Sequence, residues 1–407
     1  MPAPLALYYP LDMQSFGIHV KSYHLNNCSQ SFGFPALINF LFSRNEVFAK
    51  TDDPPFDKSS MDGYAYTNYN GEIYEFIENH IIAAGSYKDI KVGEGECIKI
   101  MTGAIIPKKC NFVQRIEWTE EIKENEKIFI KFTKKENVSN IIKKGNNKKI
   151  GEKILDKKFI LPKDIAILSC FGYDKITVKK KINVAIISSG NEIADIGADL
   201  KEGEIHDANA PMLLSRTLDL SCNGKFYGRV KDDENEIRNI LCKALDENDI
   251  ILITGGVSMG DFDYVHKILC EIGVNQIFHG LAMKPGKPLF FGKLNNKAIF
   301  ALPGNSVSAY MTFEIMVKPY ILYSFGLTYN NDYIKAVLFE DFKRKDAERL
   351  EFVPVKLYFE NTKLYVKLIK YNNSSMISSF SEANGILKID IGIENFKSGE
   401  IVDVRFI

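Results

Sequence analysis

The chain has 407 residues, of which 45% are apolar and 26% charged, which excludes a mostly disordered protein and leaves room for roughly two to four domains. The 52 basic side chains balance the 52 acidic ones, which disfavours a nucleic-acid-binding protein. No apolar run approaches the ~18 residues of a membrane span, so no membrane partner is expected. Only eight basic residues are arginine, so anion binding must rely on lysine and backbone N–H groups.

The cysteines and histidines carry no metal or disulfide pattern. Seven cysteines are scattered without a Cys-x-x-Cys pair, and six histidines show no His-x-His or His-Glu-x-x-His spacing. An odd, dispersed set of cysteines is typical of reduced thiols, and the first residues lack the charge and apolar pattern of a signal peptide. The sequence therefore predicts a cytoplasmic protein whose cysteines are small buried hydrophobic residues.

The first half of the chain predicts a β-rich domain over residues 46–140. Short β-type runs between Gly and Asn turns indicate strands at 72–77, 96–101, 112–118 and 127–133. Residues 1–45 show no helical periodicity, and residues 141–181 belong to a lysine-rich stretch. We expect these two flanking segments to form a linker or a first domain.

Residues 182–326 alternate between predicted strands and helices, and therefore predict a doubly wound, mostly parallel sheet. Continuous apolar runs at 182–188 and 249–254 are typical of strands buried on both faces. The other expected strands are 225–230, 276–283, 288–293 and 298–302, and the expected helices begin near Ala210 or span 232–248, 262–272 and 306–323. Residues 327–407 return to strands, with a hairpin turn at 359–363, and predict a small C-terminal β-barrel-like domain.

Four loops that follow strands of the predicted sheet indicate a binding site. In open α/β sheets, ligands bind beyond the carboxyl ends of the strands. Glycines let a ligand approach the backbone, and N–H groups near a helix start favour an anion. The loops contain Ser188, Gly190 and Glu192; Gly255, Gly256, Ser258, Gly260, Asp261 and Asp263; Lys284, Lys287 and Pro288; and Pro303, Gly304 and Asn305. Together they predict a pocket for a phosphorylated, nucleotide-like ligand.

Each of these loops also has a plain structural explanation. The turn at Ser188–Gly190 could be only a tight turn, and Asp261 and Asp263 could cap a helix or bind Mg²⁺. The turn at 284–288 could be solvated, although two prolines and a glycine would hold two ammonium groups rigidly enough for an oxyanion. No Gly-Lys-Ser/Thr follows the glycines, so the second loop is not a P-loop.

Two motifs outside the predicted sheet are also rich in polar residues. Asp62 precedes Gly63 within the restrained stretch 54–65, and Thr102 offers a hydroxyl group where a predicted strand ends. Asp62 could instead be a turn residue, and the aromatic residues around it could only pack.

Taken in order, the motifs of this chain resemble those of the MoeA family of molybdenum-inserting enzymes, to which the E domain of gephyrin is related. The resemblance runs from about Asp52 to the C-terminus. It rests on Pro-Pro-Phe-Asp and Met-Asp-Gly-Tyr-Ala (54–65), Met-Thr-Gly-Ala (101–104), Thr-Gly-Gly-Val-Ser-Met-Gly-Asp (254–261), Ala-Met-Lys-Pro-Gly-Lys-Pro (282–288), Leu-Pro-Gly-Asn (302–305) and Arg-Leu-Glu-Phe (349–352).

This resemblance implies an enzyme of molybdenum cofactor biosynthesis, a transferase that inserts molybdate into adenylylated molybdopterin with release of AMP and the help of Mg²⁺. It implies catalytic roles for Asp62, Thr102, Glu192, Asp232 and Asp263, with Asp261 and Asp263 as Mg²⁺ ligands. The residues implied for the molybdate pocket are Lys284, Lys287, Pro288, Arg349 and Ser374.

The resemblance also implies a homodimer of four-domain protomers, with a cleft between the sheet domain of one subunit and the β-rich domain of the other. Transient partners would be the molybdopterin adenylyltransferase and apo-molybdoenzymes. The chain departs from the family pattern at Ser306, where the family has proline, at Asn146 and Asn147, where it has acids, and in residues 1–45, which lack an amphipathic helix.

Three other functions stay open on the sequence. Residues 182–325 also resemble the enzyme of the preceding step, the adenylylation of molybdopterin. A non-catalytic scaffold and a hydrolase that cleaves the adenylate without molybdate are further alternatives. Molybdate-dependent release of AMP separates the insertion reaction from all three.

Overall fold

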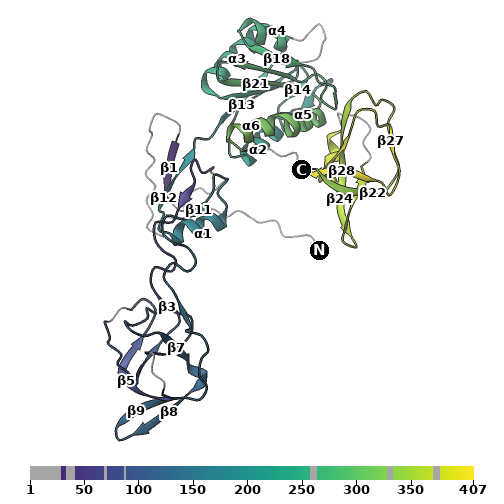
Figure 1. Ribbon diagram of the computed structural model, residues 1–407. Coiled ribbons are helices and arrows are strands. Elements are labelled where there is room, and N and C mark those ends of the chain that lie inside the picture. Colours follow the sequence, from purple (N-terminus) through teal and green to yellow (C-terminus); the bar gives the residue numbers. More distant parts are fainter. Residues whose placement is uncertain are drawn as a thin grey trace. The chain divides into compact units, whose positions relative to one another are not determined.

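The computed structural model describes residues 29–33 (backbone only), 42–67, 71–86, 89–256, 264–327, 333–369 and 376–407. These residues fall into two compact units, which part between Val178 and Lys179 (Figure 1). Within the described ranges, no helix is long and apolar enough to cross a membrane. We describe each unit by itself.

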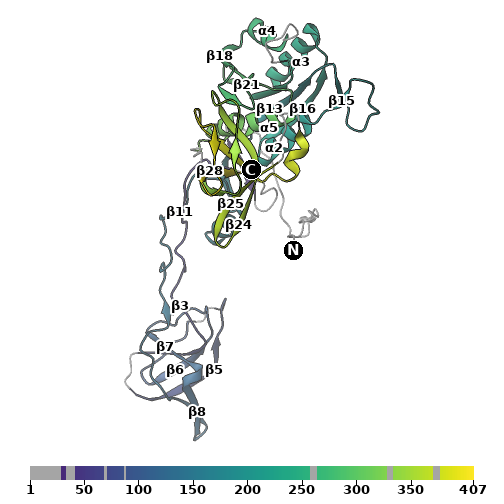
Figure 2. The same ribbon diagram turned by 90° about the vertical axis from the view of Figure 1, so that its right-hand side faces the viewer.

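The first unit is built around a six-stranded sheet of order β7-β4-β6-β5-β9-β8 (Figure 2). Its core contains Tyr66, Tyr74 and Phe132, whose rings are in contact. The four strands predicted here are confirmed, and β4 and β8 are additional. The strands are β4 (Gly63–Tyr66), β5 (Ile73–Ile82), β6 (Glu96–Ile100), β7 (Phe112–Arg115), β8 (Thr119–Glu124) and β9 (Lys127–Phe132).

The lysine-rich segment after this sheet is folded. Helix α1 (Pro162–Cys170) starts with proline, and the Asp164 carboxylate accepts a hydrogen bond from the Leu161 N–H at 2.8 Å. Leu168 on this helix is fully buried in a small apolar cluster. The two-stranded pairs of this unit are β1 (Ser29–Gly33) with β12 (Lys175–Lys179), β2 (Val47–Phe48) with β11 (Lys153–Leu155), and β3 (Lys58–Ser59) with β10 (Ile141–Ile142).

The second unit contains the predicted doubly wound sheet, of order β16-β13-β17-β21-β20-β18. Helices α3 and α4 cover one face, and α2, α5 and α6 the other (Figure 1). The strands are β13 (Asn183–Ser189), β16 (Asn223–Val230), β17 (Ile250–Thr254), β18 (Asn275–His279), β20 (Phe290–Leu294) and β21 (Lys297–Leu302). The helices are α2 (Asn209–Asp219), α3 (Glu234–Glu247), α4 (Tyr264–Glu271), α5 (Ser306–Thr312) and α6 (Lys318–Ser324).

The mostly parallel arrangement is confirmed, with one difference at the sheet edge. Strands β16, β13, β17 and β21 are parallel, but β20 and β18 add as antiparallel neighbours. The strand predicted over 276–283 ends at His279 because the chain leaves the sheet there. Residues Met283–Lys284 form β19, which pairs in parallel with the start of β24 in the C-terminal region.

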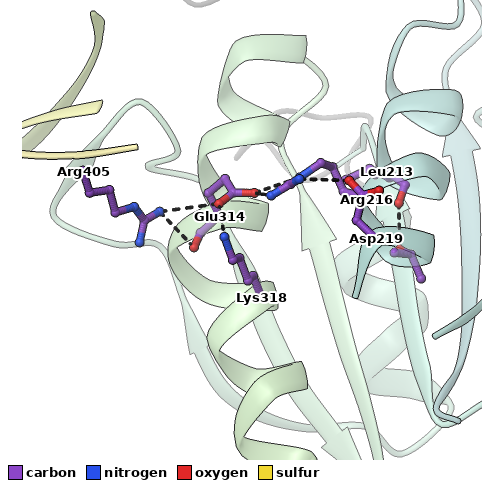
Figure 3. A network of polar contacts seen from close by, with 7 residues as sticks. Leu213, Arg216, Asp219, Glu314, Lys318 and Arg405 are labelled. Carbon is purple, nitrogen blue, oxygen red and sulfur yellow. Dashed lines mark hydrogen bonds and ion pairs between the residues drawn. The ribbon is translucent and has the colours of Figure 1, made fainter. Parts of the chain in front are cut away.

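A buried carboxylate joins three elements of the second unit. The helix predicted over 306–323 is confirmed, but its centre, Phe313–Val317, is a π-helical turn that carries the fully buried Glu314. Arg216 on α2 donates to the Glu314 carboxylate from Nε at 2.9 Å, and Lys318 donates at 3.0 Å. Arg405 on β28 donates to the Glu314 carbonyl oxygen at 3.2 Å (Figure 3). The network ties the C-terminal strand to the helices of the sheet domain.

The C-terminal region is a small closed barrel, as predicted. Strand β24 pairs with both β25 and β26, and β28 joins β26 to β22, so the strands close on themselves. Asn361 and Thr362 have φ values of 45° and 69° in the β24–β25 hairpin turn, which confirms the predicted turn. The barrel strands are β22 (Ile334–Leu338), β24 (Leu350–Glu360), β25 (Lys363–Leu368), β26 (Gly385–Ile389) and β28 (Ile401–Phe406).

Six cysteines lie within the described residues, and all are free thiols. Cys97, Cys110 and Cys222 are buried, and the other three are exposed. Burial raises the pKa of the Cys110 and Cys222 thiols to about 12, so both are neutral at physiological pH. The prediction of small buried hydrophobic cysteines is therefore confirmed for these three positions only.

Candidate functional site

A pocket of about 360 Å³ lies at the carboxyl ends of β13, β17 and β21. This is the edge at which open α/β sheets bind ligands. Three of the four predicted loops meet here, and Pro288 from the remaining loop also lines the pocket. The predicted site residues in its wall are Ser188, Glu192, Gly255, Gly256, Pro288, Pro303, Gly304 and Asn305.

The floor of this pocket depends on glycine. Gly255 has a φ of +87°, and a Cβ atom there would lie 2.1 Å from the Ser189 carbonyl oxygen. Gly190 has a φ of +148°, and a Cβ atom there would meet the Glu192 carboxylate at 2.6 Å. Any larger residue would therefore shift β13 or the Glu192 side chain, so the glycines keep two strand ends close and the backbone accessible.

Two of the predicted catalytic acids lie at this strand edge. Glu192 lines the pocket. Asp232, just after β16, accepts a hydrogen bond from the Ser189 hydroxyl at 3.3 Å, and its N–H donates to the Asn191 side chain at 3.2 Å. The structure thus brings Asp232 to the neighbouring loop, next to the pocket wall.

Asp207 and Asn209 also line the pocket, and they were not predicted from the sequence. They lie between the two-residue strand β15 (Ile205–His206), which pairs with β14 (Ile193–Ala194), and helix α2. Asp207 Oδ1 accepts hydrogen bonds at 3.0 Å from the N–H groups of Asn209 and Ala210, so it caps the helix. An Asp-x-Asn sequence directly before the predicted helix at Ala210 was the available signal.

The predicted oxyanion-binding cations form a second cluster, between the sheet domain and the barrel. Lys284 on β19 forms an ion pair with Glu351 on β24 at 2.8 Å, and Arg349 pairs with Asp346 at 3.0 Å. The Glu348 N–H, Arg349 and the nearby Lys284 hold the pKa of Asp346 below its ordinary range. Lys287 is exposed and forms no ion pair with another described residue.

The predicted pair of ammonium groups in this turn is thus only partly free, because Lys284 is already paired with Glu351. Acids at Asp346 and Glu351 already offset part of the positive charge, and the sequence reasoning missed both. Lys287 is the cation of this turn with its charge available to a ligand. An incoming dianion would have to share Lys284 and Arg349 with these carboxylates.

Arg344 is the buried support of this cation cluster. Its guanidinium donates to three backbone carbonyl oxygens, those of Ile393, Asp390 and Arg349, at 2.6, 2.7 and 2.9 Å. It also pairs with the Glu351 carboxylate at 3.3 Å, and its side chain is only 3% exposed. The planar guanidinium of Arg344 thus fixes both the backbone of Arg349 and the side chain of Glu351, which is the partner of Lys284.

In the first unit, the structure brings the two predicted residues Asp62 and Thr102 into contact, which the sequence analysis did not anticipate. Asp62 Oδ1 accepts hydrogen bonds at 2.7 Å from both the N–H and the hydroxyl group of Thr102. These two bonds hold the pKa of the Asp62 carboxyl below its ordinary range, so the group is charged at neutral pH. Both residues are exposed, so the carboxylate is accessible to a ligand.

Five predicted site residues lie outside the described ranges: Ser258, Gly260, Asp261, Asp263 and Ser374. They include both predicted Mg²⁺ ligands. Among the residues that the structure does describe, no three His, Cys, Asp or Glu side chains are grouped closely enough to hold a metal ion.

Comparison with protein families matches nearly the whole described chain. Residues 40–172 match the MoeA N-terminal region (domain I and II), residues 185–323 match a probable molybdopterin binding domain, and residues 335–407 match the MoeA C-terminal region (domain IV). The pocket residues and the sheet belong to the second match, and the cation cluster extends into the third.

Similar proteins span the same length. The molybdopterin molybdenumtransferase of Staphylococcus aureus (strain COL) is 33% identical over 88% of this chain and 87% of the relative. The molybdopterin molybdenumtransferase of Bacillus subtilis (strain 168) is 29% identical over 90% and 87%. The solved structure of a molybdopterin biosynthesis MoeA protein from Pyrococcus horikosii aligns with a TM-score of 0.78 and 28% identity over 93% of this chain and 94% of that one.

Proposed function

Because this chain belongs to the MoeA family of molybdopterin molybdenumtransferases, we propose that its strand-edge pocket binds adenylylated molybdopterin and releases AMP as molybdenum is inserted. The chain is a transferase of molybdenum cofactor biosynthesis. The observation that carries the proposal is the convergence of the loops at Ser188, Gly255 and Gly304 on one pocket. Such loops present backbone N–H groups and space for a phosphorylated ligand.

The charges of the site support the binding of both substrates. Molybdate is a dianion, and Lys287 offers an exposed cation while Lys284 and Arg349 supply two more that are shared with acids. Gly255 and Gly256 line the pocket at positive φ, where backbone N–H groups without a Cβ nearby suit a phosphate. Glu192 and Asp232 add carboxylates at the same edge, which suit proton transfer to or from the reacting oxygens.

The proposed reaction is tested by measuring AMP release from adenylylated molybdopterin with and without molybdate. We expect release that requires molybdate, and a Lys287→Ala variant that needs about tenfold more molybdate for half-maximal rate, because it loses a charge-assisted contact. The control is Lys397→Ala, which removes a C-terminal-region lysine that is 70% exposed and paired with Asp341. Its molybdate requirement should equal that of wild type.

Release of AMP without molybdate would instead make the protein a hydrolase of the adenylate. Binding of the adenylate with no release would indicate a scaffold or carrier, and formation of the adenylate from ATP would indicate the preceding step. An unchanged molybdate requirement in Lys287→Ala would remove that lysine from the molybdate site.

We further propose a homodimer in which Asp62 and Thr102 of one subunit act on the pocket of the other. The support is the family resemblance together with the accessible, charged Asp62 carboxylate. Asp62→Asn and Glu192→Gln homodimers should each be inactive, but a mixed dimer should regain up to about a quarter to a half of wild-type turnover, because one shared site is then intact. Mixed dimers as inactive as their parents would mean that each site is built within one subunit.

The remaining proposals concern the cofactor, the location and the domains. A Mg²⁺ requirement rests on Asp261 and Asp263, and we assign no reaction step to the metal. A cytoplasmic location rests on the scattered cysteines, which are typical of reduced thiols. We propose domain bounds of 46–140, 182–326 and 327–407, with 1–45 and 141–181 as a linker or first domain. The separate family matches over 185–323 and 335–407 support the last two of these domains.

A further inference from the structure

Three buried polar atoms in the pocket wall have no hydrogen-bond partner among the described residues. They are Ser188 Oγ, Asp207 Oδ2 and Asn209 Oδ1. Their residues are 2%, 6% and 7% exposed, and all three line the same pocket. A buried polar atom without a partner costs free energy, so a cluster of three points to a ligand that supplies the missing hydrogen bonds.

The neighbouring contacts fix what two of these atoms can do. The other oxygen of Asp207 is held by two N–H groups of helix α2, so the carboxylate is oriented and Oδ2 is the free acceptor. Asn209 donates its amide N–H to the Gly304 carbonyl oxygen at 2.7 Å, so the nitrogen side is occupied and Oδ1 is the free acceptor. The wall thus presents two acceptors of known orientation and one hydroxyl that can donate or accept.

We propose that Ser188, Asp207 and Asn209 select the 2-amino-4-oxo edge of a pterin ring, an inference that rests on the proposed function. That edge offers an amino group and a ring N–H as donors beside a carbonyl acceptor. Two acceptors and a hydroxyl donor are its complement. An adenine edge places one ring acceptor beside its amino group, which leaves one of the two wall acceptors without a donor.

The first test changes a hydrogen-bond acceptor into a donor at Asp207 and makes the opposite change in the ligand. In Asp207→Asn, the amide oxygen can still cap α2, so an NH₂ donor replaces the free acceptor. The probes are pterin and lumazine, in which an oxo group replaces the 2-amino group. The full chain should bind pterin at least about tenfold more tightly than lumazine, and Asp207→Asn should prefer lumazine, because each mismatched pair leaves a buried group unpaired.

The matched control is Asp233→Asn. Asp233 caps α3 with the same pair of contacts, to the N–H groups of Asn235 and Glu236 at 3.0 and 2.9 Å, but does not line the pocket. Its pterin-to-lumazine ratio should equal that of wild type. The proposal would be overturned if Asp207→Asn kept the wild-type ratio of pterin affinity to lumazine affinity. It would also be overturned if the wild-type chain bound AMP in this pocket but bound neither pterin nor lumazine.

A second variant keeps the proposal testable if Asp207→Asn does not fold. Ser188→Ala removes a buried hydroxyl that has no described partner, so its melting temperature should not fall, while pterin binding should weaken severalfold. Unchanged pterin affinity would exclude Ser188 from the contact. The ring preference is measured without molybdate or turnover, so a wild-type chain that shows the switch but releases no AMP would contradict only the proposed function. AMP release without the switch would contradict only this inference.

Discussion

Asp62→Asn is expected to lower the rate of AMP release by about a hundredfold or more, the effect typical of losing a positioned acid–base or charged group. The amide oxygen can still accept both hydrogen bonds from Thr102, so the turn is retained and only the negative charge is lost. The melting temperature should therefore stay close to that of wild type. The measurement is steady-state AMP release with saturating molybdate, alongside a thermal melt.

A control for this substitution lies in the same motif. Asp57 is also held by two contacts, from Lys143 Nζ and the Lys144 N–H, each at 2.8 Å. Asp57→Asn should leave turnover largely unchanged because no catalytic role is predicted for it. If Asp62→Asn keeps wild-type turnover, or if it melts well below wild type, then Asp62 is a structural residue of the turn.

Glu314→Ala is expected to reduce the unfolding free energy of the second unit by about 3–5 kcal/mol, the range for breaking a buried ion pair. Glu314 is fully buried, and its loss removes the carboxylate that Arg216, Lys318 and Arg405 share, so that Asp219 remains as a partner of Arg216 (Figure 3). Guanidinium unfolding followed by a probe in the second unit gives the measurement. The transition of the first unit should not move.

The comparison for this variant is an exposed ion pair of the same unit. Glu271 pairs with Arg238 on the surface, and Glu271→Ala should have little effect on stability because exposed pairs contribute little. Equal stability of Glu314→Ala and Glu271→Ala would show that the buried network contributes no more than a surface pair. A further loss of turnover in Glu314→Ala is expected, since Arg216 lies on the helix that begins at the pocket wall.

The sheet and most of the pocket could be predicted because their signals are local. Continuous apolar runs gave the buried strands, and the glycine- and proline-containing loops after them could be assigned to one sheet edge by topology alone. The roles of Asp62 and Thr102 followed only from the family resemblance, and their contact was not predicted. The structure supplies the two hydrogen bonds that join them.

What the sequence could not predict depends on three-dimensional neighbours. The sequence around Asp207 and Asn209 indicates only the start of a helix. The fold shows that both residues line one pocket and that one oxygen of each is buried without a hydrogen-bond partner among the described residues. The turn at 284–288 was predicted to hold two ammonium groups rigidly, and only the structure shows that β19 pairs with β24 and places Glu351 beside Lys284. Strand β20 has the same apolar pattern as a parallel strand, so the pattern could not predict that it runs antiparallel to its neighbours.

Arginine is scarce in this chain, and two of its arginines each hold several acceptors at once. Arg344 holds three carbonyl groups and a carboxylate with one rigid fork, and Arg216 spans two carboxylates. Lysine supplies most of the positive charge elsewhere in the chain, but a single ammonium group cannot reach so many acceptors at fixed angles. Arg344→Lys and Arg216→Lys should therefore lose several of these contacts at once, although the positive charge is kept.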